Sequence, residues 1–126
     1  MVGIVIVSHS RNLAESVVEF TAVMAAEAKV AAAGGLEDGG FGTSFDKIYK
    51  AVDRVYSEDG VIILMDMGSA VMTAEMVIEA YGSDRIQMAD CPLVEGAVAA
   101  TIYAAGGMNR EEILNYLKTV KDTRKF

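Results

Sequence analysis

The sequence predicts an α/β protein whose open, four-stranded, mainly parallel sheet carries helices on both faces. Strand-like apolar runs and helical segments alternate four times along the 126 residues. The connections between the runs are long enough for the crossover helices that parallel strands need. Crossover connections between parallel strands are right-handed. To place helices on both faces of the sheet, the chain must therefore add strands in one direction and then in the opposite direction, which favours the strand order 2-1-3-4. We expect a single domain over residues 1–126.

The first half of the chain supplies two strand–helix pairs. Residues 2–7 form a continuous β-branched run, typical of a strand buried on both faces, and residues 29–33 form a weaker strand. A first helix is expected at about residues 14–24, with apolar residues at helical spacing: Leu13, Val17, Phe20 and Met24. The second helix follows the glycine-rich segment GGLEDGGFGTS, with Thr43 and Asp46 as a capping pair. Its apolar stripe is Phe45, Ile48, Val52 and Val55.

The second half repeats the pattern. Residues 61–65 are the clearest interior strand, and residues 85–89 form a short fourth strand that the segment DCP ends. Between these strands a helix at about residues 70–80 has its apolar face at Val71, Ala74, Ile78 and Tyr81. A small-residue helix at about residues 93–105 ends at two glycines. Asn109 and Glu112 form a capping box for a final helix that carries Ile113, Leu117 and Val120.

Composition excludes several classes of function. The formal net charge of -7 would repel a nucleic-acid backbone, so no nucleic-acid partner is expected. The basic residues near the end, Lys118, Lys121, Arg124 and Lys125, are expected to complement the negative end of the last helix. No apolar run approaches the length of a membrane span, and the first residues do not resemble a signal peptide. With Cys91 as the only cysteine, we expect a soluble, cytoplasmic protein.

The candidate site follows from the expected strand order. Ligands of such sheets bind at the carboxyl ends of the strands where the winding reverses, here between the first and third strands. His9, the only histidine, follows the first strand, and Asp66 follows the third. We therefore expect the two side chains to face each other across one crevice. Its neighbouring wall should be formed by Gly39, Gly40, Gly42 and Thr43.

Two interpretations of this pair remain open from the residues alone. His9 could satisfy a buried carbonyl or cap the next helix, and Asp66 could cap the helix that begins near Ser69. Alternatively, His9 could serve in anion chemistry, because it lies between Ser8 and Ser10 at an expected helix N-terminus. Free N–H groups there hold anions and favour a neutral imidazole. A carboxylate that accepts from Nδ1–H would then leave Nε2 as a nucleophile for phosphorus.

Other chemistries lack their residues. The sequence has no G-x-S-x-G elbow, no P-loop, and no second histidine or cysteine for a zinc set, so we expect neither a metal nor a cofactor. A receiver-like domain phosphorylated on Asp66 is the nearest rival, but it needs an acidic pair after the first strand to hold Mg²⁺. A dimeric adaptor without catalysis would leave Asp66 and the glycine loop unexplained.

Four segments in order, GIVIVSHS, GGFGTSFDKI, LMDMGSAVMTAEM and ADCPLVEGAVAA, resemble a known family. They are similar to the M subunits of phosphoenolpyruvate-dependent dihydroxyacetone kinase, whose enzyme IIA-like domain is of the mannose type. The resemblance extends from Gly3 to about Lys118. It implies that His9 is the phosphorylated residue and that Asp66 orients and stabilises its imidazole. It also implies phosphate or partner contacts by Ser10, Gly40, Gly42, Thr43, Met67, Gly68 and Ser69.

The resemblance also implies a pathway. Phosphate would come from phosphoenolpyruvate through enzyme I and HPr, and general HPr is the expected donor because no HPr-like domain follows Phe126. The acceptor would be ADP, with Mg²⁺, bound on subunit L, and its ATP would serve subunit K. The alternative is a sugar-type enzyme IIA that passes phosphate to a transporter IIB component. A homodimer is expected through the faces of Met72 and Met76, without the strand swap that an extra C-terminal strand allows.

Overall fold

A computed structural model describes residues 1–126 and contains one four-stranded sheet. All neighbouring strands are parallel and their order is β2-β1-β3-β4, which confirms the predicted topology. The strands are β1 (Gly3–Ser8), β2 (Val30–Gly34), β3 (Val61–Met65) and β4 (Ile86–Met88). The helices are α1 (Arg11–Met24), α2 (Phe45–Val55), α3 (Val71–Tyr81), α4 (Leu93–Ala105) and α5 (Arg110–Leu117). Two short 3-10 helices cover Gly68–Ala70 and Val120–Asp122.

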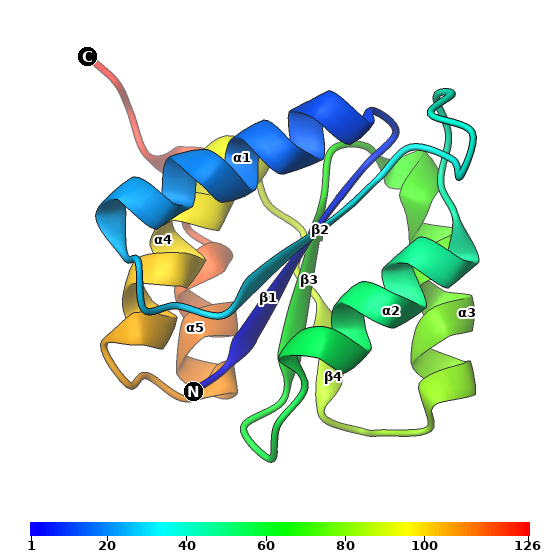
Figure 1. Cartoon of the computed structure of the whole chain (residues 1–126). Coiled ribbons are helices and arrows are strands. Elements are labelled where there is room, and N and C mark those ends of the chain that lie inside the picture. The colour runs from blue at the N-terminus through cyan, green and yellow to red at the C-terminus, as the bar shows by residue number, and fades with distance from the viewer.

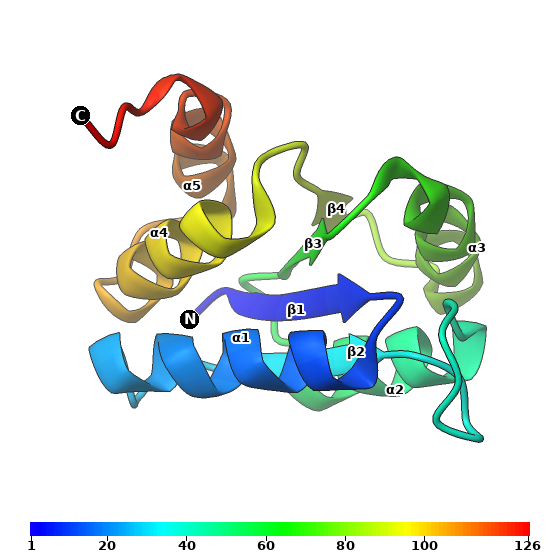
Figure 2. The same ribbon diagram turned by 90° about the horizontal axis from the view of Figure 1, so that it is seen from above.

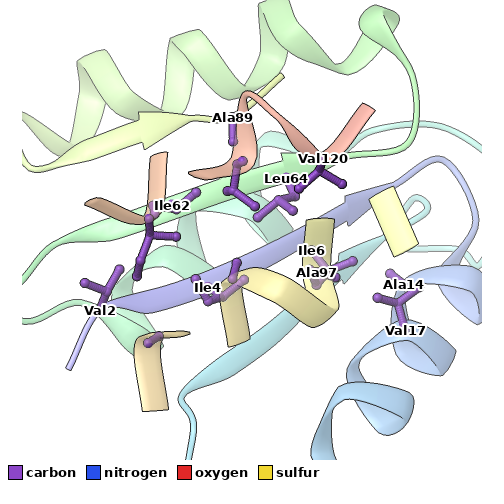
Figure 3. Packing of buried hydrophobic residues seen from close by; sticks show 14 residues of the cluster. Val2, Ile4, Ile6, Ala14, Val17, Ile62, Leu64, Ala89, Ala97 and Val120 are labelled. Carbon is purple, nitrogen blue, oxygen red and sulfur yellow. The ribbon is translucent and has the colours of Figure 1, made fainter. Parts of the chain in front are cut away.

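The helices form two layers around the sheet, with α1, α4 and α5 on one face and α2 and α3 on the other (Figures 1 and 2). Alternate residues of β1 point to opposite faces, so Ile4 and Ile6 join one buried cluster while Val5 and Val7 join the other. Figure 3 shows the cluster under α1, α4 and α5. None of the helices is both long enough and apolar enough to span a bilayer.

Helix α1 differs from the prediction in its start and in its buried face. It begins at Arg11, because the Ser10 side chain accepts a hydrogen bond from Leu13 N and caps it. The buried residues are Ala14, Val17 and Thr21, whereas the expected Leu13, Phe20 and Met24 are exposed. The reason is the close approach of α1 to β2: a Cβ on Gly34 would lie 2.7 Å from the Cβ of Ala14. Only small side chains fit between them.

The expected cap of α2 was displaced by one residue. Ser44, not Thr43, accepts from Lys47 N, and the Ser44 hydroxyl donates to Glu37. Ser44 is almost fully buried. The expected stripe of α2 is confirmed for Ile48, Val52 and Val55, which are buried, whereas Phe45 is half-buried. In α3, by contrast, Val77 is buried while Ile78 and Tyr81 are only half-buried.

The carboxyl-terminal region confirms one expectation and corrects another. Asn109 and Glu112 form the predicted capping box of α5. Of the four basic residues expected at the end of that helix, Lys118 is its C-cap residue, but the last turn holds no basic residue and Lys121, Arg124 and Lys125 lie beyond the helix. Lys125 instead forms an ion pair with Glu95 in the first turn of α4, at 3.3 Å.

Candidate functional site

His9 and Asp66 meet at the carboxyl ends of β1 and β3, as the strand order predicted. Val7 pairs with Met65 in the sheet, and Asp66 N donates to Val7 O at 3.1 Å, which places the two loops side by side. The His9 Nδ1 atom then lies 2.9 Å from Asp66 Oδ1. Their side chains are 23% and 14% exposed. The pair is therefore shielded on most sides but open to the surface.

The second carboxylate oxygen of Asp66, Oδ2, also accepts hydrogen bonds. Asp66 Oδ2 accepts from the Ser8 hydroxyl at 2.9 Å and from the backbone N–H of His9 at 3.0 Å. Burial alone would raise the pKa of Asp66, but hydrogen bonds from the His9 backbone, the His9 ring and Ser8 outweigh it and lower the pKa. Asp66 does not cap the following helix: the residue at that position is Met67, with no side-chain cap bond.

This arrangement decides which ring nitrogen is free. An ionised carboxylate can only accept hydrogen bonds, so Nδ1 of His9 must carry the proton. In the neutral ring Nε2 then has a lone pair, and the Ser69 hydroxyl, 2.9 Å away, donates to it. A histidine held in this way can act as a nucleophile through Nε2, while Asp66 stabilises the positive charge that develops on the ring.

The glycine loop, residues 39–43, lies beside the His9–Asp66 pair and is held in place by hydrogen bonds. Gly42 N donates to His9 O at 2.9 Å, and the backbone of Gly42 has a φ of 148°, which favours glycine. Gly40 N donates to Asp38 Oδ1 at 2.8 Å. Both N–H groups already have acceptors: Gly42 fastens the loop to the His9 backbone, and Gly40 holds a turn within the loop. Phosphate contacts from either glycine stay a prediction.

Two further parts of the expected site are the segment Gly68–Ser69 and the side chain of Thr43, and only the first has free donors for a ligand. Gly68 and Ser69 begin a 3-10 helix, so their backbone N–H groups have no acceptor within that helix, and both residues are exposed. Thr43 Oγ1 lies 3.2 Å from Oγ1 of Thr73 in α3, which links the glycine loop to the helix behind Ser69. No cluster of three or more histidine, cysteine or acidic side chains is arranged to hold a metal ion.

Comparison with known proteins identifies the family. Residues 3–114 match the EIIA-man family, described as the PTS system fructose IIA component. The chain belongs to this family. A relative from Listeria innocua, "PEP-dependent dihydroxyacetone kinase 1, phosphoryl donor subunit DhaM", is 35% identical over 94% of this chain and 94% of its own length. The "phosphotransferase subunit DhaM" of a PTS-dependent dihydroxyacetone kinase from Lactococcus lactis is 34% identical, over 92% and 93% of the two chains.

The chain also matches part of longer relatives, and its fold matches several solved structures. The DhaM subunit of Escherichia coli is 37% identical over 90% of this chain, but the chain spans only 26% of that protein. The EIIA component from Streptococcus agalactiae shares the fold, with a TM-score of 0.72 and 15% identity over 97% and 93% of the two chains. A protein of unknown function superposes with a TM-score of 0.81 at 28% identity, over 94% and 93%.

Two residues that contact the candidate site, Ser8 and Thr73, were not predicted from the sequence to be part of it. Ser8 is fully buried, donates to Asp66 and accepts from Ser10 N at 3.0 Å. A signal for Ser8 was present, because a polar residue ending a β-branched strand directly before the only histidine needs a polar partner. Nothing in the sequence pointed to Thr73, which is one polar residue among many on helix surfaces.

Proposed function

We propose that the protein is a phosphohistidine carrier in which Nε2 of His9 accepts a phosphoryl group from HPr and passes it to ADP on the L subunit of dihydroxyacetone kinase. The observation that carries the proposal is the hydrogen bond between His9 Nδ1 and Asp66 Oδ1, which in the neutral ring leaves the lone pair on Nε2 of a side chain that is 23% exposed. The relatives named phosphoryl donor or phosphotransferase subunits support the pathway.

The transfer step needs no base. The Nε2 lone pair attacks phosphorus, the bond between phosphorus and the donor breaks, and its electron pair leaves with the donor. No proton has to leave Nε2, and the ring becomes cationic, a form that the Asp66 carboxylate stabilises through Nδ1–H. The Ser69 hydroxyl must first release Nε2, since it occupies the lone pair of the resting site.

The released hydroxyl is then placed to bind the incoming group. The Ser69 hydroxyl and the backbone N–H groups of Gly68 and Ser69 can donate to phosphoryl oxygens beside Nε2. These donors would stabilise the negative charge of the phosphoryl group through hydrogen bonds. Discharge reverses the step, and the acceptor subunit provides the nucleotide, so dihydroxyacetone never contacts this chain.

Asp66 is a poor candidate for the phosphorylated residue itself, as a receiver-like function would require. Three donors engage its two oxygens: Ser8, the His9 backbone and the His9 ring. Attack by either oxygen would break bonds that hold the site together. Transfer to a transporter IIB component is the second candidate because the family that matches residues 3–114 is described as the PTS system fructose IIA component. The homodimer through Met72 and Met76 likewise stays a prediction; both side chains are exposed.

Labelling tests the carrier residue. Incubation with labelled phosphoenolpyruvate, enzyme I and HPr should phosphorylate the wild-type protein, and the label should be lost in acid and retained in alkali, as a phosphoramidate is. His9→Ala should take up no label. Label that persists in His9→Ala, or that is stable in acid and lost in alkali, would mean that a group other than the His9 imidazole, a carboxylate or a hydroxyl, is phosphorylated instead.

The acceptor is tested by discharging the labelled protein. Mixed with free ADP it should form little ATP, because the chain supplies neither a nucleotide site nor charge neutralisation for ADP. Mixed with subunit L carrying ADP and Mg²⁺ it should discharge rapidly. Equal rates in the two mixtures would contradict the carrier role, and discharge only to a IIB component would favour the second candidate.

A further inference from the structure

Four cations line one groove along the outer edge of β2. Arg11 comes from α1, and Lys47, Lys50 and Arg54 come from α2, while Glu15 is the only acidic residue among the ten that line the groove. The chain as a whole has 11 basic residues and a net charge of -7. More than a third of its positive charge is therefore gathered in one concave surface of an otherwise acidic protein.

Most of this charge has no ion-pair partner within the chain, although the Glu37 carboxylate is close enough to Lys47 and Lys50 for their charges to contribute, after its hydrogen bond from Ser44, to lowering its pKa. Only Arg11 has a carboxylate within ion-pair distance, Glu15 at 3.6 Å, and both of those side chains are more than half exposed. The Lys47 Nζ atom donates to Gly34 O, a neutral acceptor, at 2.9 Å. Lys47, Lys50 and Arg54 follow one another at three- and four-residue spacing, which places them on one face of α2. The positive side chains thus form a row along the groove.

One end of the groove, at Arg11 and Gly34, is next to His9, whereas Arg54 in the last turn of α2 lies toward the other end. β2 is an edge strand, paired only with β1, and α1 and α2 lie on either side of it (Figure 1). Its last residue, Gly34, pairs with Ser8, and Gly35 N donates to Ser8 O at 3.0 Å. Arg11 follows His9 by two residues. A protein seated over Nε2 of His9 is therefore close enough to cover this end of the groove.

From the charge of the groove and its position we infer that it is the docking surface for an acidic face of the ADP-carrying acceptor subunit. The inference rests on the proposed function, and it concerns how the acceptor is recognised. Discharge requires two anionic groups to meet, the phosphoryl group on His9 and the diphosphate of ADP, whereas charging involves only one. Since this chain is acidic overall, the approach of an anionic acceptor is repelled everywhere except where cations gather.

A second explanation for the same residues is protective. Lysines beside an edge strand keep other strands from pairing with it, and β2 has an open edge. In that case the charges would matter for solubility and not for phosphate transfer. The two explanations differ in what the loss of the charges does to the reaction with the acceptor, so kinetics can separate them.

The test compares two double variants with the same change in net charge. Lys50→Glu/Arg54→Glu reverses two cations of the groove, and Lys121→Glu/Arg124→Glu reverses two exposed cations beyond α5. Each labelled protein is mixed with subunit L carrying ADP and Mg²⁺ at several salt concentrations, and charging by HPr is measured in parallel. The neutral pair Lys50→Gln/Arg54→Gln is included because a reversed charge near the end of α2 could lower stability.

The groove variants should lose about tenfold or more in kcat/KM for subunit L, through KM, with a weaker salt dependence and normal charging by HPr. The control pair should behave like the wild type. Equal losses in the groove and control pairs, no loss in either, or a loss confined to HPr would each overturn the inference. If the wild-type protein is charged but does not discharge to subunit L at all, the proposed function fails, a result distinct from a selective loss in the groove variants.

Discussion

Ser8→Ala tests how far the site depends on a residue that never touches the phosphoryl group. Ser8 is 0% exposed, and its hydroxyl both donates to Asp66 Oδ2 at 2.9 Å and accepts from Ser10 N at 3.0 Å. Alanine removes one donor from a carboxylate and leaves one N–H without its acceptor. Each loss costs about 1–3 kcal/mol in a shielded setting, so we expect the variant to be destabilised by about 3 kcal/mol.

The same change has a pH signature. The Ser8 hydroxyl is one of the groups that hold the pKa of Asp66 below its ordinary value of 3.8, so its removal raises that pKa. A carboxyl group with a depressed folded-state pKa stabilises the fold above its unfolded pKa, and this stability is lost as pH falls through the folded pKa. The difference in unfolding free energy between wild type and Ser8→Ala should therefore be full at neutral pH and shrink in acid.

Thermal unfolding measures both effects. About 3 kcal/mol corresponds to a decrease of about 10 °C in Tm for a domain of this size. Ser16→Ala, at an exposed serine of α1, is the matched control and should unfold like the wild type. If Ser8→Ala matched Ser16→Ala at neutral pH, the hydroxyl would not support Asp66. A loss of the same size at every pH would show that Ser8 acts only through the Ser10 backbone.

Two more variants test the site and the packing behind it. Asp66→Asn should transfer phosphate about 10- to 100-fold more slowly, measured by quenched flow, because a charge-assisted bond of about 1.5–3 kcal/mol to the cationic ring is lost; a rate equal to the wild type would remove Asp66 from the reaction. Gly34→Ala should lower the unfolding free energy by about 1–3 kcal/mol, since a Cβ there would lie 2.6 Å from Ser10 O and 2.8 Å from the Cα of Arg11. An unchanged Tm for Gly34→Ala would show that α1 can move away from β2.

The strand order and the pairing of His9 with Asp66 could be predicted because both follow from general properties of parallel sheets. Alternating strands and helices require crossovers, crossovers have one hand, and carboxyl ends meet at one edge of the sheet. The residues after the first and third strands are thus neighbours whatever the details of packing. The prediction needed only two facts from the sequence: where these strands end and which polar residues follow.

The buried face of α1 could not be predicted in the same way. Spacing alone favoured Leu13, Phe20 and Met24, yet Phe20 is 48% exposed. What decides the face is a contact between elements, the approach of Ala14 to Gly34, and that contact exists only once α1 lies over β2. The exposed Phe20 then lines a shallow apolar groove with Val94 and Ile102 of α4. Helical periodicity identifies an amphipathic helix more reliably than it identifies which apolar residues face the core.

The cationic groove, on which the proposed docking depends, likewise could not be predicted from the sequence. In the sequence the basic residues are most densely gathered near the carboxyl terminus, at Lys121, Arg124 and Lys125, but there the structure places them beyond α5, with one paired to Glu95. Arg11 is 36 residues or more from the α2 cations, so no local pattern joins them. They converge because α1 and α2 follow β1 and β2 and lie on either side of the edge strand β2. Arg11 and Lys47, in the first turns of these helices, lie at the end of the groove near His9, whereas Arg54, in the last turn of α2, lies toward the other end.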